Sequence, residues 1–147
     1  MRRIGSLILA GIFLAGCGTV SPQVATRRWI STTSFTAAFH NLHDDLDRTV
    51  SYLRRPRRDT LELRTLCRVV SLDLHKLNDT LPSPDAQANE LLAEGLDRLS
   101  RGTALCSAAT GESSPAPLLR EFRSAYGGIY FGALRMWSVA GLADQSR

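Results

Sequence analysis

Residues 35–53 read FTAAFHNLHDDLDRTVSYL, and apolar side chains recur in this stretch at steps of three and four. They are Phe35, Phe39, Leu42, Leu46, Val50 and Leu53. Because an α-helix has about 3.6 residues per turn, this spacing gathers the apolar residues on one face. The stretch therefore predicts an amphipathic helix, buried along one side, that ends before Arg55-Pro56.

The same spacing recurs in three later stretches. The first starts at Asp59 and Glu62, which resemble a capping box, and ends at Pro82; its apolar positions are Leu63, Cys67, Val70, Leu74, Leu77 and Leu81. The second starts at Ser83-Pro84, an N-cap followed by proline, and carries Ala88, Leu92, Gly95, Leu99, Gly102 and Cys106. The third follows a polar loop at 111–117 and carries Leu118, Phe122, Tyr126, Ile129, Ala133, Trp137 and Ala140. Short connections at 54–58 and 82–84 then predict an all-α fold, an antiparallel up-down four-helix bundle.

The last of these helices is unusually rich in glycine and aromatic residues. Between residues 124 and 143 the only charged residue is Arg135, and Gly128 and Gly132 match the close-packing pattern GxxxG. A charge at the centre of a bilayer costs about 2.5–3.5 kcal/mol, so tight packing inside the bundle is favoured over a membrane span. An exposed partner or membrane surface is the other alternative, and a kink is expected at Gly127-Gly128.

Upstream of the bundle, Arg2-Arg3 precede an apolar run at residues 4–14 that is shorter than the roughly 20 residues of a membrane span. Leu14-Ala15-Gly16-Cys17 closes this run. These first 17 residues resemble the signal peptide and lipobox of bacterial lipoproteins, whereas the remainder resembles no family. The resemblance implies cleavage before Cys17 and acylation of its thiol. It implies a location on the extracytoplasmic face of the cell membrane or, since Gly18 follows, of an outer membrane.

The chain is accordingly divided into a signal peptide at 1–16, a lipidated tether at 17–28 and a helical bundle domain at 29–147. The tether contains Ser21-Pro22 and no apolar periodicity. Removal of Arg2 and Arg3 leaves 16 of the 18 basic residues against 14 acidic ones. This near balance gives no indication of nucleic-acid binding.

Cys67 and Cys106 are the two cysteines that remain after acylation of Cys17, and an even pair in an oxidising compartment favours a disulfide. A hairpin turning at residues 82–84 would nevertheless place Cys106 about 10 Å beyond the residue opposite Cys67. Either the third helix breaks near Gly102 and folds back, or the two thiols stay apart.

Arginines dominate the first connection, with Arg54, Arg55, Arg57 and Arg58 flanking Pro56. They are candidates for contact with an anionic membrane surface or with a partner protein. The alternative is a solvated loop whose cations stabilise the carboxyl end of the preceding helix.

Two histidines and an aspartate, His40, His43 and Asp47, lie at helical spacings on one flank of the first helix. Imidazole and carboxylate groups are zinc ligands, which makes the three residues candidates for a metal site. No fourth ligand is assigned, and a solvated polar face is the alternative.

The sequence contains none of the common catalytic motifs, and Ser113 and Ser114 lie in a loop without an assignable base. We therefore expect a protein that is not an enzyme and has no cofactor. The leading hypothesis is an envelope lipoprotein that packs against another envelope protein or serves a structural role. The alternative is a helical bundle that binds a small apolar molecule or a metal ion.

Overall fold

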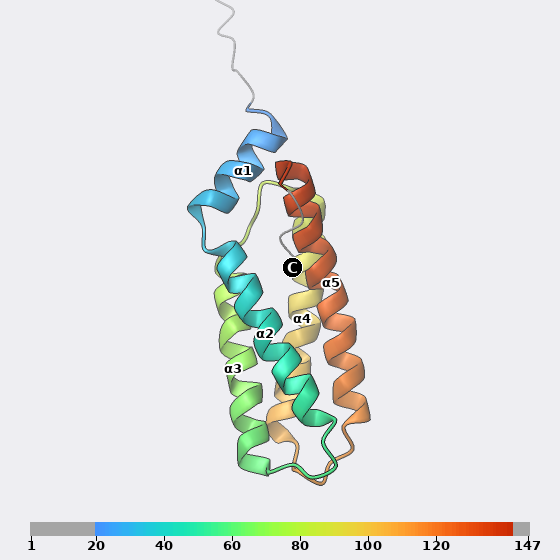
Figure 1. The fold of residues 1–147 in the computed structure, drawn as a ribbon. Coiled ribbons are helices and arrows are strands. Elements are labelled where there is room, and N and C mark those ends of the chain that lie inside the picture. The colour runs from blue at the N-terminus through green and yellow to red at the C-terminus, as the bar shows by residue number, and fades with distance from the viewer. Residues whose placement is uncertain (1–19, 143–147) are drawn as a thin grey trace, which may run out of the picture.

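Residues 20–142 are described by the computed structural model, and in this part of the chain it contains five α-helices and no strand (Figure 1). In chain order the helices are α1 (Pro22–Thr32), α2 (Phe35–Leu53), α3 (Thr60–Asn78), α4 (Ala86–Ala108) and α5 (Ala116–Ala140). The predicted all-α fold is confirmed. The expected signal peptide at 1–16 and the lipobox cysteine, Cys17, lie outside the described residues.

The four long helices, α2 to α5, lie side by side as a helical bundle, and α1 extends from one end of it (Figure 1). Neighbours in sequence are neighbours in space: α2 packs on α3, α3 on α4, and α4 on α5. The contact between α4 and α5 is the most extensive, whereas α2 and α5 touch only sparsely. The bundle is thus tightly packed on one side of α5 and loosely packed on the other.

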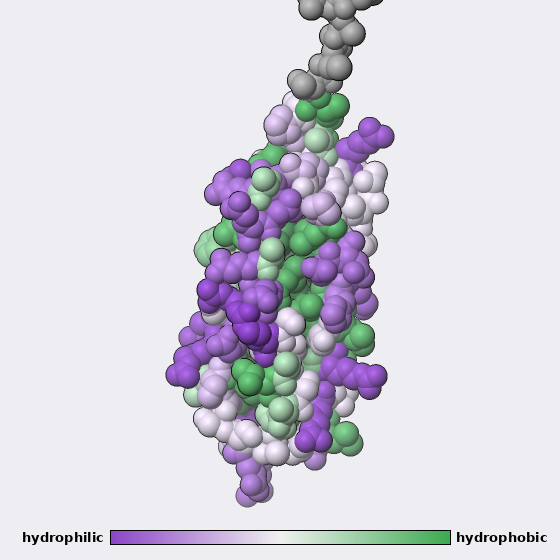
Figure 2. Space-filling view, turned by 180° about the vertical axis from the view of Figure 1, so that it is seen from behind, coloured by the Kyte–Doolittle hydropathy of each residue, from purple (hydrophilic) through white to green (hydrophobic). Residues whose placement is uncertain are grey.

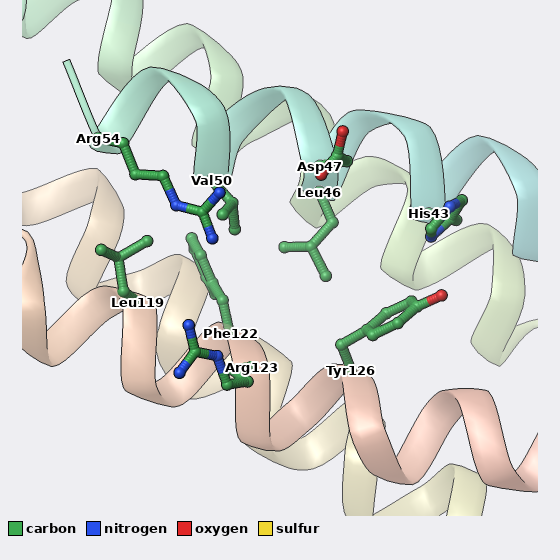
Figure 3. A pocket seen from close by; sticks show the side chains of 9 residues that line it. All are labelled: His43, Leu46, Asp47, Val50, Arg54, Leu119, Phe122, Arg123 and Tyr126. Carbon is green, nitrogen blue, oxygen red and sulfur yellow. The ribbon is translucent and has the colours of Figure 1, made fainter.

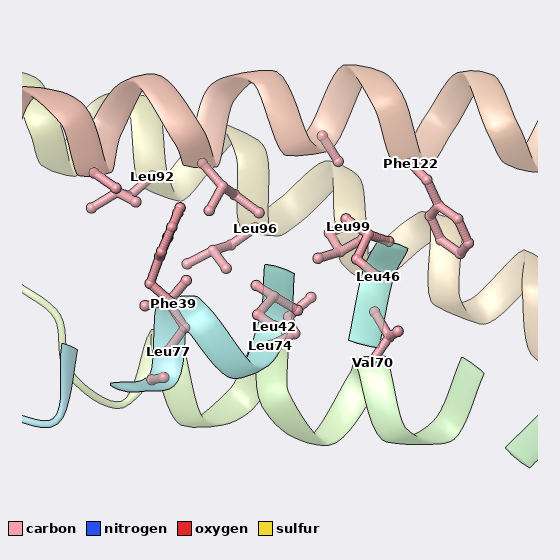
Figure 4. Packing of buried hydrophobic residues seen from close by; sticks show 14 of the residues in the cluster. Phe39, Leu42, Leu46, Val70, Leu74, Leu77, Leu92, Leu96, Leu99 and Phe122 are labelled. Atoms are coloured by element: carbon pink, nitrogen blue, oxygen red, sulfur yellow. The ribbon is translucent and has the colours of Figure 1, made fainter. Parts of the chain in front are cut away.

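The core contains most of the apolar positions that the sequence periodicity predicted. Val50, Leu81 and Tyr126 are only half-buried, whereas Tyr52, Leu96 and Met136 are buried without having been predicted. Side chains from all four long helices meet along the axis of the bundle (Figure 4). They include Phe39, Leu42, Leu46, Val70, Leu74, Leu77, Leu92, Leu96, Leu99 and Phe122. Burial of each leucine or phenylalanine side chain stabilises the fold by about 1.5–3 kcal/mol.

The starts of α3 and α4 are fixed by aspartate caps. The carboxylate of Asp59 accepts a hydrogen bond from the Glu62 amide at 2.8 Å, as the capping pattern predicted. The prediction for α4 is wrong, because its N-cap is Asp85, which accepts from the Ala88 amide at 2.7 Å. The hydroxyl of Ser83 is instead engaged with the backbone of Asp85: it donates to the Asp85 carbonyl at 3.1 Å and accepts from the Asp85 amide at 3.3 Å.

The predicted flexible tether at 17–28 is wrong from Pro22 onwards, where α1 begins. Proline occupies the first turn of α1, and Thr26 on the inner face is 1% exposed. The guanidinium group of Arg27 donates two hydrogen bonds, at 3.1 and 2.9 Å, to the carbonyl of Ala140 at the end of α5. A helix held by hydrogen bonds from a polar side chain needs no apolar periodicity. For this reason the sequence did not predict α1.

A disulfide joins Cys67 of α3 to Cys106 of α4, with their Cα atoms 5.8 Å apart. The predicted turn at 82–84 was the source of the register conflict. Cys67 lies 11 residues before the end of α3 at Asn78, whereas Cys106 lies 20 residues after the start of α4 at Ala86. The two helical segments therefore differ in length by nine residues, about 14 Å. The connection at 79–85 spans this length, because it extends beyond the end of α3 before α4 begins (Figure 1). Therefore α4 needs no break at Gly102, and it has none.

Three glycines bring the backbones of α4 and α5 together, and we call this contact the α4–α5 seam: Gly95 of α4 with Gly128 and Gly132 of α5. Gly102 of α4 leaves room for the ring of Phe122, which an added Cβ atom would approach to 2.9 Å. A Cβ atom added at Gly95 would lie 2.7 Å from the backbone nitrogen of Ile129. One added at Gly128 would lie 3.2 Å from the Cα atom of Gly95. The close packing predicted for the GxxxG pair is confirmed, and the two helices fit only because these side chains are absent.

Arg135, the one charged residue between 124 and 143, has a partner that the sequence did not predict. Arg135 donates to both carboxylate oxygens of Asp85, at 2.7 and 3.0 Å, and so ties the start of α4 to the far half of α5. No helix between residues 20 and 142 combines the length and the hydropathy that a membrane crossing requires. α5 continues uninterrupted through Gly127-Gly128, where a kink was expected.

Candidate functional site

The loose contact between α2 and α5 leaves a groove of about 160 Å³ in the side of the bundle (Figure 3). We call it the α2–α5 groove. Its lining residues are His43, Leu46, Asp47, Val50 and Arg54 from α2, and Leu119, Phe122, Arg123 and Tyr126 from α5.

The floor of the groove is the core of the bundle itself. Leu46 and Phe122 are 4% and 0% exposed, so the packed core lies directly beneath the groove and the partly exposed walls supply most of its accessible apolar surface. Val50, Leu119 and Tyr126 are half-buried and form the walls. The site is therefore an apolar depression on a firmly packed base.

Two arginines stand at one end of the groove. Arg54 is the C-cap of α2, and Arg123 lies one residue after the buried Phe122 on α5. Figure 3 shows both guanidinium groups turned toward the space between the two helices. Neither arginine forms an ion pair with any residue in the 20–142 range. That end of the groove consequently offers two cations to an anion.

The other end of the groove is aromatic. The imidazole of His43 stacks on the ring of Tyr126, with ring centroids 5.3 Å apart, and on the ring of Phe39 at 6.4 Å. Burial raises the pKa of the Tyr126 phenol above its usual value, and the nearby Tyr130 and Asp47 raise it further. Tyr126 thus stays a neutral hydroxyl at physiological pH.

The three candidate metal ligands are not brought together as a ligand set. His40 packs against the ring of Trp137 at 6.4 Å, His43 is stacked on Phe39 and Tyr126, and Asp47 lines the groove. Within the described chain, no cluster of three or more His, Cys, Asp or Glu side chains is suited to hold a metal ion. Both imidazoles are instead used to pack α2 against the aromatic residues of α5.

The four arginines of the first connection do not form one patch. Arg55 lies over the ring of Tyr52 at 4.9 Å, and Arg58 donates to the carbonyl oxygens of Arg55 and Ser113, at 2.8 Å each. Arg58 thereby fastens the 54–59 connection to the 109–115 connection. Arg57 is exposed to solvent, and Arg54 alone of the four reaches the groove.

The aromatic residues of α5 divide between core and surface. Trp137 is 1% exposed and packs against the rings of Phe35 and Phe39 at 6.3 and 5.1 Å, whereas Phe131 is 62% exposed. The other large exposed apolar residues of the described chain are Val20, Val24, Leu61, Leu72 and Leu105, which are spread over α1, α3 and α4 and the residues before α1. On the face opposite that of Figure 1, hydrophobic residues are interspersed with charged ones (Figure 2).

Sequence reasoning missed the contribution of Arg123. A signal for it exists, because the positions three and four residues away on α5 are Leu119, Arg120, Tyr126 and Gly127, none of them acidic. A helical arginine without an acidic neighbour at these spacings has no local ion-pair partner. Its position next to Phe122 on the buried stripe would have placed it at the edge of the core.

Comparisons of this chain with models of known protein families, with curated proteins and with solved structures find no match. What the site can do follows from its geometry alone. A small apolar depression with two cations at one end is suited to bind a molecule that has an apolar body and a negative charge.

Proposed function

We propose that this chain is a lipid-anchored, non-catalytic binding module on the extracytoplasmic side of a bacterial envelope, with Cys17 as the acylated residue. The observation that carries the proposal is the disulfide between Cys67 and Cys106. Disulfides persist in oxidising compartments and are rare in the cytosol, so the bond agrees with the export that the lipobox implies. Two or three acyl chains on Cys17 would make a lasting anchor.

The fold supports an orientation for the anchored module. Cys17 lies only five residues before Pro22, a separation of at most about 18 Å, so the α1 end would face the membrane. The arginine connection at 54–58 lies at the other end of α2, about 28 Å further along its axis (Figure 1). Contact of Arg57 with a partner protein therefore fits this orientation better than contact with the anchoring membrane.

The same proposal includes the topology of the long helices. We infer an antiparallel up-down four-helix bundle for α2 to α5, with α1 as an added cap. The support is that the connections at 54–59 and 109–115 meet at one end, where Arg58 binds the carbonyl of Ser113. Each long helix is also adjacent to the next one in the chain.

A second candidate function is favoured by the α2–α5 groove. Pockets that hold small molecules are apolar depressions with a few well-placed polar groups, and the groove has this composition. In this function the bundle binds a small apolar molecule, and the anchor keeps it at the membrane surface.

The anchor is tested by the intact mass of the protein extracted from its own membranes. We expect a chain that starts at Cys17 and carries acyl chains, and a Cys17→Ser variant that is released from the membrane fraction. A Ser21→Ala variant is the matched control, because it changes a nearby hydroxyl and leaves the thiol in place. An unacylated wild-type mass, or full membrane retention of Cys17→Ser, would overturn the proposal.

The partner role is tested by a photo-cross-linking amino acid at position 57 in living cells. The control places the same amino acid at position 72, since Leu72 is exposed in the middle of α3. We expect a discrete protein adduct from position 57 and none from position 72. Identical results at the two positions would contradict a partner at the arginine end.

A further inference from the structure

We propose that the α2–α5 groove binds a small organic carboxylate, with its apolar body on Leu46 and Phe122 and its carboxylate between Arg54 and Arg123. The inference rests on the second candidate function above and adds to it the chemical class of the ligand. It is argued from the size of the groove, the composition of its floor and the placement of its charges.

The size of the groove limits the apolar part of the ligand. A cavity of about 150 Å³ accepts a benzene molecule, and the groove measures about 160 Å³. An apolar body of roughly six to ten carbon atoms fits this space, because the groove also opens to solvent. A protein interface of ordinary size involves about 20–30 residues on each side, whereas nine residues line the groove. The groove is therefore suited to a small molecule rather than to a protein surface.

The charges of the groove select an anion. Arg54 and Arg123 approach from two different helices, and each exposes its guanidinium group at the same end of the apolar floor (Figure 3). The one acidic residue of the lining is Asp47, which lies on α2 nearly two turns before Arg54. Arg54 is left without an ion pair inside the described residues, as is Arg123.

A carboxylate is the anion that these arginines suit best among small apolar molecules. Guanidinium groups donate two parallel hydrogen bonds to a carboxylate, and the fork geometry makes the pair stronger than a neutral hydrogen bond. Binding also removes apolar ligand surface from water against Phe122, which is itself part of the core. The aromatic wall at Tyr126 gives a ring on the ligand a partner for offset stacking.

The rigidity of the site favours binding without reorganisation. Leu46 and Phe122 are held by the packed core, and Tyr126 is held by its stacking on His43. Only the two arginine side chains have freedom to adjust. A ligand therefore pays for the ordering of these two side chains and little more.

The test is an NMR titration of the acylated, mature protein in nanodiscs of zwitterionic lipid with 4-phenylbutyrate, using empty nanodiscs as the blank. We expect saturable shifts of the ring signals of Phe122 and Tyr126, with a dissociation constant in the millimolar range or below. The neutral amide of the same acid keeps the apolar body and lacks the charge. We expect it to bind about tenfold more weakly or worse, since a charged hydrogen bond contributes about 1.5–3 kcal/mol.

Arginine variants distinguish binding of the carboxylate in the groove from attraction to the net positive charge of the protein. Arg54→Gln and Arg123→Gln, both at exposed side chains, are each expected to weaken 4-phenylbutyrate about tenfold and to leave the amide unchanged. Arg57→Gln is the matched control, because it removes an equal charge from the same connection outside the groove. A loss with Arg57→Gln as large as that with Arg54→Gln would overturn the proposal.

Three other results would also overturn it: no shift in the millimolar range, equal affinity for the acid and the amide, or Phe122 and Tyr126 shifts caused by the nanodisc lipid alone. Failure of the anchor is distinguished by the Cys17→Ser protein. It is expected to bind 4-phenylbutyrate as the wild type does, because Cys17 is remote in sequence from every lining residue. If the wild type itself is found to be unacylated and still binds 4-phenylbutyrate, the anchor is contradicted and the groove stands.

Discussion

Of the helices that contact α5, its two long neighbours α4 and α2 meet it in opposite ways. Across the α4–α5 seam the backbones touch, so that a Cβ atom at Gly132 would lie 3.2 Å from the backbone nitrogen of Leu92. Across the α2–α5 groove only side chains meet, and they leave about 160 Å³ between them. The two contacts lie on different sides of α5. Glycines form the first contact, and large side chains form the second.

The difference shows how residue size places a binding site in a bundle. Glycines let α4 approach α5 to backbone contact, whereas between α2 and α5 the larger side chains of His43 and Tyr126 stack on each other and the groove opens beside them. Two further links hold α4: the ion pair between Asp85 and Arg135 ties its start to α5, and the disulfide ties Cys106 to α3. The open side has no comparable fastening among the described residues. The tight packing of α5 on α4 stabilises the bundle, so the fold does not require equally tight packing of α5 on α2.

The largest expected effect comes from removal of the disulfide, which fastens α3 to α4. The bond closes a loop with a sequence separation of 39, and such a loop stabilises by about 4 kcal/mol, chiefly through the unfolded chain. We expect Cys67→Ala with Cys106→Ala to lose about this much in urea unfolding. The control is wild type with reductant, which should lose a similar amount. Equal stability of the oxidised wild type and the double variant would show that the disulfide adds nothing to the packing of α3 on α4.

The next effect tests the seam directly. In Gly95→Ala the new Cβ atom would lie 2.7 Å from the Ile129 nitrogen and 2.9 Å from the Ala125 carbonyl oxygen, both of them backbone atoms. Alanine gains about 1 kcal/mol of helix propensity, but overpacking against a backbone costs about 1–3 kcal/mol and requires the helices to move apart. We expect a net loss of about 1–2 kcal/mol in urea unfolding. A stabilised Gly95→Ala would contradict the close approach.

One side of this comparison, the seam, was predictable from the sequence. Gly95 and Gly102 occupied positions of a buried stripe, and Gly128 with Gly132 matched a close-packing pattern. Because glycine at a buried helical position leaves room for a second backbone, the seam was recognisable. The groove was not, since periodicity assigns Leu46 and Phe122 to buried faces without stating the distance between the helices.

Three other features escaped the sequence analysis for a common reason. The register of α3 against α4 depends on how far the 79–85 connection climbs, and α1 depends on the bond from Arg27 to the Ala140 carbonyl. The salt bridge from Arg135 to Asp85 spans 50 residues. Each feature is a contact between distant residues, whereas helical periodicity reports only local structure.

A smaller effect is expected from the ion pair that fastens the closed side. The hydrogen bonds from Arg135 hold the pKa of the Asp85 carboxyl below its usual 3.8, against the opposing effect of burial. Since the folded-state pKa is the lower one, this stabilisation is present above pH 3.8 and is lost as the pH falls through the folded-state pKa. We expect Arg135→Gln to lose about 1 kcal/mol at neutral pH and less in acid.

A second carboxyl, that of Asp45, also changes the stability of the wild type in acid. The quantity to measure is therefore the difference in unfolding free energy between the wild type and Arg135→Gln. Its pKa is raised, first by burial and then by a hydrogen bond with Asp73, so its contribution is lost as the pH rises through its folded-state value. The two carboxyls act in opposite directions in the same acid range. Unfolding by urea at several pH values should show Arg135→Gln and wild type converging in acid, and a constant gap would contradict the ion pair.

The smallest expected effect uses two adjacent glycines that face different surroundings. No described atom lies within 4 Å of a Cβ atom built at Gly127, whereas one built at Gly128 would lie 3.2 Å from the Cα atom of Gly95. Gly127→Ala should therefore stabilise the protein by up to about 1 kcal/mol, because alanine costs the helix less entropy than glycine. Gly128→Ala gains the same propensity but presses on the seam, and we expect it to be neutral or destabilising. Thermal unfolding of the two variants compares neighbouring positions with one chemical change. An equal shift in both would mean that α4 does not approach α5 at Gly128, and the contrast between seam and groove would then not hold.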